Sequence, residues 1–137
     1  MNIERLSKYA LLLAAIGFIG MGLQGLFTPL AFFGRLGSES LAVSTVSEIR
    51  TVYGGFMNGN ALMFAYVAFF RKELYRFTLS LIAVISTGLL LGRIVSLIAD
   101  GMPNALTWVF IVIELAAFVI STGLAVLGKR EAKVELN

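Results

Sequence analysis

The sequence predicts an all-α integral membrane protein, a four-transmembrane-helix bundle with both termini in the cytoplasm. Its composition is the first reason. Hydrophobic residues make up 58% of the 137 residues and charged residues only 14%, whereas soluble domains carry about 25% charged residues. So few charges cannot cover a water-facing surface. The pattern is the second reason, because the apolar runs are continuous, whereas the strands of a transmembrane barrel alternate.

Four apolar runs are long enough to be transmembrane helices. A bilayer core about 30 Å thick requires about 20 apolar residues in a helix. We expect spans at about residues 9–33, 48–70, 77–99 and 105–128, within one membrane domain that covers residues 1–137. The first run exceeds the apolar core of a cleaved signal peptide, so we expect it to stay in the protein.

Helix-breaking and capping residues agree with these spans. Pro29 is expected to kink or end the regular part of the first span. Thr45 and Glu48 fit a capping box that opens the second span. Gly101 and Pro103 fit the end of the third, with Gly at the C-terminal cap and Pro preventing continuation.

Lys and Arg predict the orientation. Eight of them lie on one side of a four-span topology, Arg35 and Arg50 lie on the other, and Arg93 lies inside the third span. The eight are Arg5, Lys8, Arg71, Lys72, Arg76, Lys129, Arg130 and Lys133. The positive-inside rule therefore places both termini in the cytoplasm of a multi-pass protein in the cell inner membrane.

The same basic residues indicate the partners. They favour contact with anionic membrane lipids, and a homo-oligomer or a membrane-protein partner is compatible with the chain. No basic face with interleaved aromatic residues is present, so we expect no nucleic-acid partner. The sequence has no Cys and no His, which removes thiolate and imidazole chemistry. We therefore predict no metal site, no cofactor and no assigned catalytic residue.

Polar residues gather in the outer halves of the predicted spans. The candidate residues of a polar cavity are Gln24, Glu48, Arg50, Tyr53, Arg93, Ser96, Asp100 and Glu114. A charge at a helix centre costs about 2.5–3.5 kcal/mol, so it needs a partner or water. Arg93 and Glu114 lie at similar distances from the turn that joins the last two spans. We expect them to pair at the floor of an outward-facing cavity, with Glu48, Arg50 and Asp100 at its rim.

Small residues are expected at the helix contacts. Gly55 and Gly59 on the second span, and Gly88 and Gly92 on the third, have the spacing that permits close helix approach. A further stripe on the fourth span combines small and polar residues, namely Glu114, Ala117, Ser121 and Ala125. We expect these stripes to face the bundle interior.

Several candidates also have a purely structural interpretation. Glu48 could serve simply as a helix cap, and Asp100 could be an ordinary turn residue. Tyr53 and Trp108 suit the aromatic belt at the membrane boundary. The Arg93–Glu114 pair could be structural, although buried pairs are weak evidence for stability.

Three segments resemble a known family. SEIRTVYGGFMNGNAL at residues 47–62, GRIVSLIADGMPN at 92–104 and IEL at 113–115 resemble an uncharacterised bacterial family of small four-span membrane proteins, a domain of unknown function distantly similar to DoxX-like proteins. The resemblance covers nearly the whole chain and implies a four-helix bundle. It gives weight to Glu48, Arg50, Tyr53, Arg93, Asp100 and Glu114, and it implies no reaction or substrate.

Three functions are compatible with the sequence. The first is a non-catalytic membrane module whose outward-facing cavity binds a small polar or amphiphilic ligand, such as a lipid, or a partner protein. The second is an enzyme that modifies a lipid or isoprenoid with Glu48, Asp100 or Glu114 as acid or base. The third is a channel or transporter built from several copies. We favour the first.

The orientation can be tested with single cysteines, because the chain has none of its own. Cysteines at residues 37 and 102 should react with a membrane-impermeant thiol reagent applied to intact cells, and cysteines at residues 2 and 137 should not. Labelling at residues 2 and 137 with protection at 37 and 102 would contradict the predicted orientation and indicate the opposite one.

Overall fold

The computed structural model describes residues 2–38 and 40–134, with no account of side chains beyond Lys129. The described residues form helices joined by turns, and no strand occurs among them. Asn137 and the side chains of Arg130 and Lys133 lie outside the described part, and so do the predictions made for them. The all-helical prediction is confirmed for the rest.

Three helical stretches are long and apolar enough to cross a membrane: Ile3–Phe27, Lys72–Ala99 and Ala105–Lys129. They correspond to α1 (Ile3–Phe27), to α5 (Tyr75–Ala99) with the short 3-10 turn η2 (Lys72–Leu74) before it, and to most of α6 (Ala105–Val134). They support the prediction of a membrane protein.

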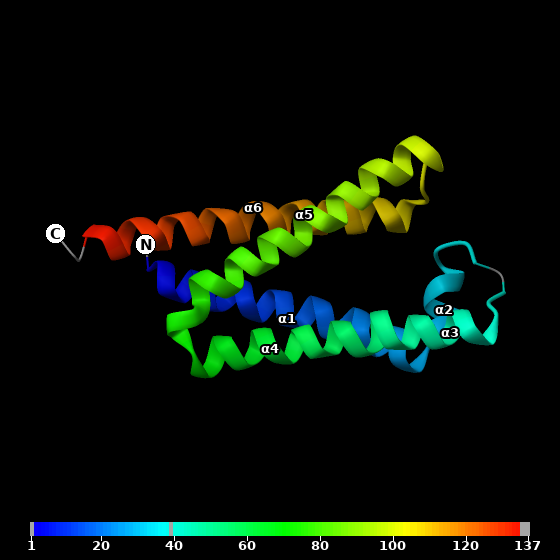
Figure 1. Ribbon diagram of the computed structural model, residues 1–137, viewed down its shortest axis with the longest axis horizontal. Coiled ribbons are helices and arrows are strands. Elements are labelled where there is room, and N and C mark those ends of the chain that lie inside the picture. The colour runs from blue at the N-terminus through cyan, green and yellow to red at the C-terminus, as the bar shows by residue number, and fades with distance from the viewer. Residues whose placement is uncertain (1, 39, 135–137) are drawn as a thin grey trace.

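The predicted second span is divided among three shorter elements. These are α3 (Val43–Ile49), the π-helical segment η1 (Arg50–Phe56) and α4 (Met57–Phe70). None of the three is long enough to cross a bilayer alone. They follow one another without a break, and Figure 1 shows them as one long rod beside α1.

The helices together have two ends, which we call the terminal end and the distal end (Figure 1). The terminal end contains the start of α1, the α4–α5 turn and the last turns of α6. The distal end contains the short helix α2 (Pro29–Gly34), α3 and the connection between α5 and α6. Helix α1 packs mainly along η1 and α4, and α5 packs mainly along α6.

The hydrophobic core lies towards the terminal end. Its buried members are Leu11, Ala15, Phe64, Val67, Ala68, Tyr75, Leu79 and Ile82. The Tyr75 hydroxyl donates a hydrogen bond to the carbonyl oxygen of Ala68 at 2.8 Å, which satisfies the polar end of a buried ring. In α5 no residue after Ser86 is buried, and Ser121 is the only buried residue of α6 up to Lys129. The distal halves of α5 and α6 therefore pack chiefly against each other.

Two of the three predicted helix boundaries are confirmed. Helix α1 ends at Phe27, and Pro29 begins α2. Helix α5 ends at Ala99, and Gly101 follows it with a φ of +91°, a conformation that costs Gly little. The capping box at Thr45 is wrong, because the helix begins two residues earlier, at Val43, without a side-chain cap.

The glycines with the least room for a side chain lie where α1 packs against η1 and the start of α4. A Cβ atom at Gly25 would lie 2.8 Å from the Tyr53 carbonyl carbon, and one at Gly54 would lie 3.1 Å from the Leu26 Cα atom. A Cβ at Gly22 would lie 2.7 Å from the Asn58 side chain. The backbones of α1 and η1 touch because Gly25 and Gly54 carry no side chain, and Gly22 leaves room for the Asn58 side chain of α4.

The predicted glycine contacts are wrong. A Cβ at Gly59, Gly88 or Gly92 would meet nothing within 4 Å, and at Gly55 it would meet only a carbonyl oxygen of its own segment, at 3.9 Å. The prediction assumed an uninterrupted α-helix. A π-helical turn holds more residues than an α-helical turn, so the face that meets α1 contains Gly54. On α5, the glycines lie in a part of the helix that has few neighbours.

We expect Gly25→Ala to destabilise the protein, because its Cβ would collide with backbone atoms of η1. Overpacking of this kind costs about 1–3 kcal/mol. The matched control is Gly59→Ala, whose Cβ enters open space and whose helix propensity is better than that of Gly. Unfolding in mild detergent should show a lower midpoint only for Gly25→Ala. Equal midpoints would contradict the assigned contact.

Candidate functional site at the distal end

The centre of the site is an ion pair between α5 and α6. Arg93 donates from Nε to Glu114 Oε2 at 3.2 Å and from Nη2 to Glu114 Oε1 at 2.8 Å. Two parallel bonds of this kind are the strong, orientation-specific form of an Arg–carboxylate contact. The predicted pairing of Arg93 with Glu114 is confirmed.

The pair lies well inside its helices. Arg93 precedes the end of α5 by six residues, and Glu114 follows the start of α6 by nine. At about 1.5 Å per residue, both lie roughly 9–14 Å from the distal end. A bilayer core is about 30 Å thick, so a membrane crossed by α5 and α6 surrounds the pair with hydrocarbon. In that setting each charge depends on the other.

The Arg93 side chain keeps hydrogen-bonding capacity that Glu114 does not use. A guanidinium carries five N–H donors. Two of them bind Glu114, and the other three have no acceptor among the described residues. The Arg93 side chain is 31% exposed and that of Glu114 is 12% exposed. The open side of the pair therefore presents donors rather than acceptors.

An aromatic cluster connects this region to η1 and α2. Tyr53 lies on η1. Its ring meets the Phe33 ring edge-on, with centroids 5.1 Å apart, and the Phe32 ring at 6.2 Å. Phe32 is buried and also lies 6.4 Å from the Phe110 ring of α6. The sequence did not indicate these Phe residues, since the chain has eleven Phe without a distinctive spacing.

The other predicted site residues form separate local contacts. Arg50 donates from Nη1 to the Leu26 carbonyl oxygen. Gln24 accepts from Arg35 Nη2 at 3.1 Å and donates to the Gly20 carbonyl oxygen. Glu48 is exposed and makes no side-chain hydrogen bond to another described residue. These residues all lie towards the distal end.

Ser96 and Asp100 form their own contact at the end of α5. The Ser96 hydroxyl donates to Asp100 Oδ2 at 2.8 Å, and both residues are exposed. Nearby, Asn104 donates from Nδ2 to the Arg35 carbonyl oxygen at 3.1 Å, which links the α5–α6 connection to α2. The structure therefore brings Arg93 and Glu114 together, and it places Tyr53 against Phe32 and Phe33. The cavity with a rim of Glu48, Arg50 and Asp100 stays a prediction.

The π-helical segment is a feature that the sequence analysis missed. Two side-chain amides turn back to carbonyl oxygens in it: Asn58 donates to Gly54 and Asn60 to Phe56, each at 2.8 Å. π-Helical turns are rare and frequently occur at functional sites. The only available signal was a pair of Asn residues inside an otherwise apolar span.

Comparisons with known proteins identify the family. A family model described as "Domain of unknown function (DUF4345)" matches residues 6–125, which include every candidate site residue. The chain belongs to the DUF4345 family. No curated protein and no solved structure is significantly similar to it. Among the described residues of this family member, no group of three or more acidic side chains could hold a metal ion.

The energetic coupling of Arg93 and Glu114 can be measured with a double-mutant cycle. Arg93→Leu or Glu114→Gln alone leaves an unpaired charge or an unpaired polar partner, and breaking a buried pair costs about 3–5 kcal/mol. The double variant should be far more stable than the sum of the two single losses implies. Additive losses in detergent unfolding would show that the two side chains do not interact.

Proposed function

We propose that the protein is a multi-pass inner-membrane protein with four spans and cytoplasmic termini, and that it binds an amphiphilic ligand at Arg93 and Glu114 without transforming it. The ligand has acceptor oxygens in its headgroup, as a phosphate or a carboxylate does, and an apolar chain. The distant kinship with DoxX-like proteins remains a prediction beside it.

The continuity of residues 43–70 supports a fourth span. Each element within it is short, but helical backbone continues from Val43 to Phe70. Its charged residues, Glu48 and Arg50, lie in the part nearest the distal end, and residues 51–70 carry no charge. A stretch of this length at about 1.5 Å per residue can cross a core about 30 Å thick.

The distribution of cations supports the orientation. Among the described side chains, the basic residues at the terminal end are Arg5, Lys8, Arg71, Lys72, Arg76 and Lys129. Those at the distal end are Arg35 and Arg50. The positive-inside rule places the terminal end in the cytoplasm and the site towards the opposite leaflet.

The observation that carries the function is the set of three N–H donors of Arg93 that lack an acceptor among the described residues. In hydrocarbon an unsatisfied donor is costly, so water or a ligand must supply oxygen atoms. Planar donors that Glu114 holds in place match phosphate and carboxylate oxygens well. The ligand is therefore recognised through its acidic or phosphate-bearing head.

The surroundings of the pair favour an amphiphile over a fully polar solute. Ile94 and Val95 on α5, and Val112 and Leu115 on α6, each expose half or more of their surface. An acyl or isoprenoid chain can lie on these faces while its head reaches Arg93. Both Glu114 oxygens accept from Arg93, so this carboxylate is better placed to orient the Arg93 guanidinium than to act as a catalytic acid or base.

Binding can be followed through Trp108, the only Trp in the chain, which lies on α6 nearer the distal end than Glu114. We expect a phosphate-headed amphiphile, brominated close to the phosphate, to quench Trp108 fluorescence saturably in a nonionic detergent. The double variant Arg93→Leu with Glu114→Leu should lose the saturable part.

The matched control is Thr87→Leu, which adds an apolar side chain to α5 and leaves the pair intact. Thr87 is exposed and donates only to a carbonyl of its own helix. The Thr87→Leu variant should show the same saturable quenching of Trp108 as the wild type. Equal quenching of the wild type and the double variant would contradict ligand binding at the pair.

A further inference from the structure

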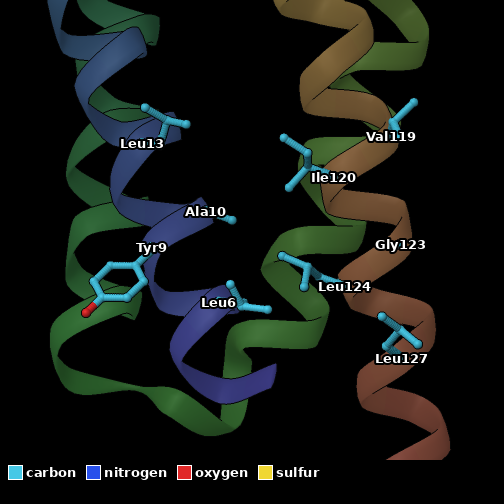
Figure 2. Close-up of a pocket in the computed structure, with 9 residues that line it drawn as sticks. All are labelled: Leu6, Tyr9, Ala10, Leu13, Val119, Ile120, Gly123, Leu124 and Leu127. Carbon is cyan, nitrogen blue, oxygen red and sulfur yellow. The ribbon is translucent and has the colours of Figure 1, made fainter. Parts of the chain in front are cut away.

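A groove between α1 and α6 opens at the half of the molecule opposite the candidate site. It has a volume of about 440 Å³ and is lined by apolar side chains. Figure 2 shows Leu6 and Ala10 of α1 pointing across it towards Ile120 and Leu124 of α6. Gly123 forms part of its α6 wall, and a Cβ there would meet no atom within 4 Å.

A smaller pocket, lined by both polar and apolar residues, adjoins the terminal end of this groove. It measures about 180 Å³, and Leu124 lines both spaces. Ser7 of α1, Lys72 of η2 and Arg76 of α5 line it, together with the carboxylates of Glu4 and Glu73. An apolar groove that leads to hydroxyl and charged groups has the layout of a site for an amphiphile.

The charges around the pocket favour an anionic head. Glu73 binds Arg71, and Lys72 lies 3.8 Å from Glu4. Arg76 is exposed and has no acidic partner among the residues that the structure describes. One cation is therefore left uncompensated where the groove reaches the membrane surface.

We propose that the groove and the pocket together bind one anionic glycerophospholipid of the leaflet at the terminal end. One acyl chain lies between α1 and α6, and the phosphate contacts Arg76 and Lys72. A second copy of this chain in the same orientation would bring another basic terminal end against the first, which like charges oppose. The proposal rests on the membrane orientation proposed above and is independent of ligand binding at Arg93.

The test uses the full-length protein in bilayers with equal amounts of phosphatidylglycerol and phosphatidylcholine. After extraction into mild detergent, native mass spectrometry counts the bound lipids. The wild type should retain one lipid, preferentially phosphatidylglycerol. Gly123→Leu fills the groove and should lose the lipid of either class, whereas Gly88→Leu, an equally open glycine away from the groove, should retain it.

A second pair of variants tests the headgroup contact. Arg76→Gln should reduce the preference for phosphatidylglycerol about fivefold, the effect of about 1 kcal/mol per cation near the surface. Lys129→Gln removes an equal charge at the same end, outside the pocket, and should have a smaller effect.

Four results would overturn the proposal. The first is that Gly123→Leu retains the lipid as the wild type does, and the second is that Gly123→Leu and Gly88→Leu lose it equally. The third is that Arg76→Gln and Lys129→Gln reduce the preference for phosphatidylglycerol equally. The fourth is that the wild type is a dimer and that Gly123→Leu dissociates it. The quenching of Trp108 reports on the distal site alone, so failure at one site is distinguishable from failure at the other. Reversed cysteine labelling would instead remove the orientation on which the leaflet assignment depends.

Discussion

The contact between the backbones of α1 and η1 sets the geometry of the distal end. At Gly25 and Gly54 no side chain separates the two segments, so even a methyl group would force them apart. From this contact Arg50 reaches the Leu26 carbonyl oxygen, and the Tyr53 ring meets Phe33. A π-helical segment supplies the required register, and side-chain amides bind two of its carbonyl oxygens.

The ion pair between Arg93 and Glu114 has a different role from this backbone contact. It lies in the halves of α5 and α6 that have few neighbours. Buried ion pairs are weak contributors to stability when compared with apolar residues of similar volume. The distal halves of α5 and α6 could pack together with Leu in both positions. What the pair adds is a guanidinium whose plane Glu114 fixes and whose remaining donors have no acceptor among the described residues. This feature connects the geometry of the pair with the proposed ligand.

Isolated charges and helix-breaking residues were the features that the sequence predicted well. Arg93 and Glu114 stand alone in apolar runs, where the cost of an unpaired charge leaves few alternatives, and counting residues from the turn places them at one depth. Pro29 and Gly101 act locally, through their own backbone preferences. Each of these inferences needs only the residue and its immediate neighbours.

Features that depend on tertiary register could not be predicted in this way. The choice of Gly54 over Gly55 follows from the π-helical turn, and the pair of Asn residues in this apolar span does not indicate at which residue such a turn begins. The groove beside Gly123 was also missed. In a membrane helix the lipid-facing and the protein-facing side chains are equally apolar, so periodicity does not distinguish them.

The two proposed sites differ in the charge that each presents, and this difference determines what each can select. Glu114 neutralises Arg93, so the distal site offers oriented donors without net charge, and it can accept a zwitterionic or an acidic head. At the terminal end Glu73 and Glu4 pair with Arg71 and Lys72, and Arg76 has no acidic partner among the described residues, so the charge left there favours an anion. Low dielectric surroundings strengthen the contact at the distal site, which lies deeper along its helices. Geometry thus governs recognition at the distal end, whereas net charge governs it at the terminal end.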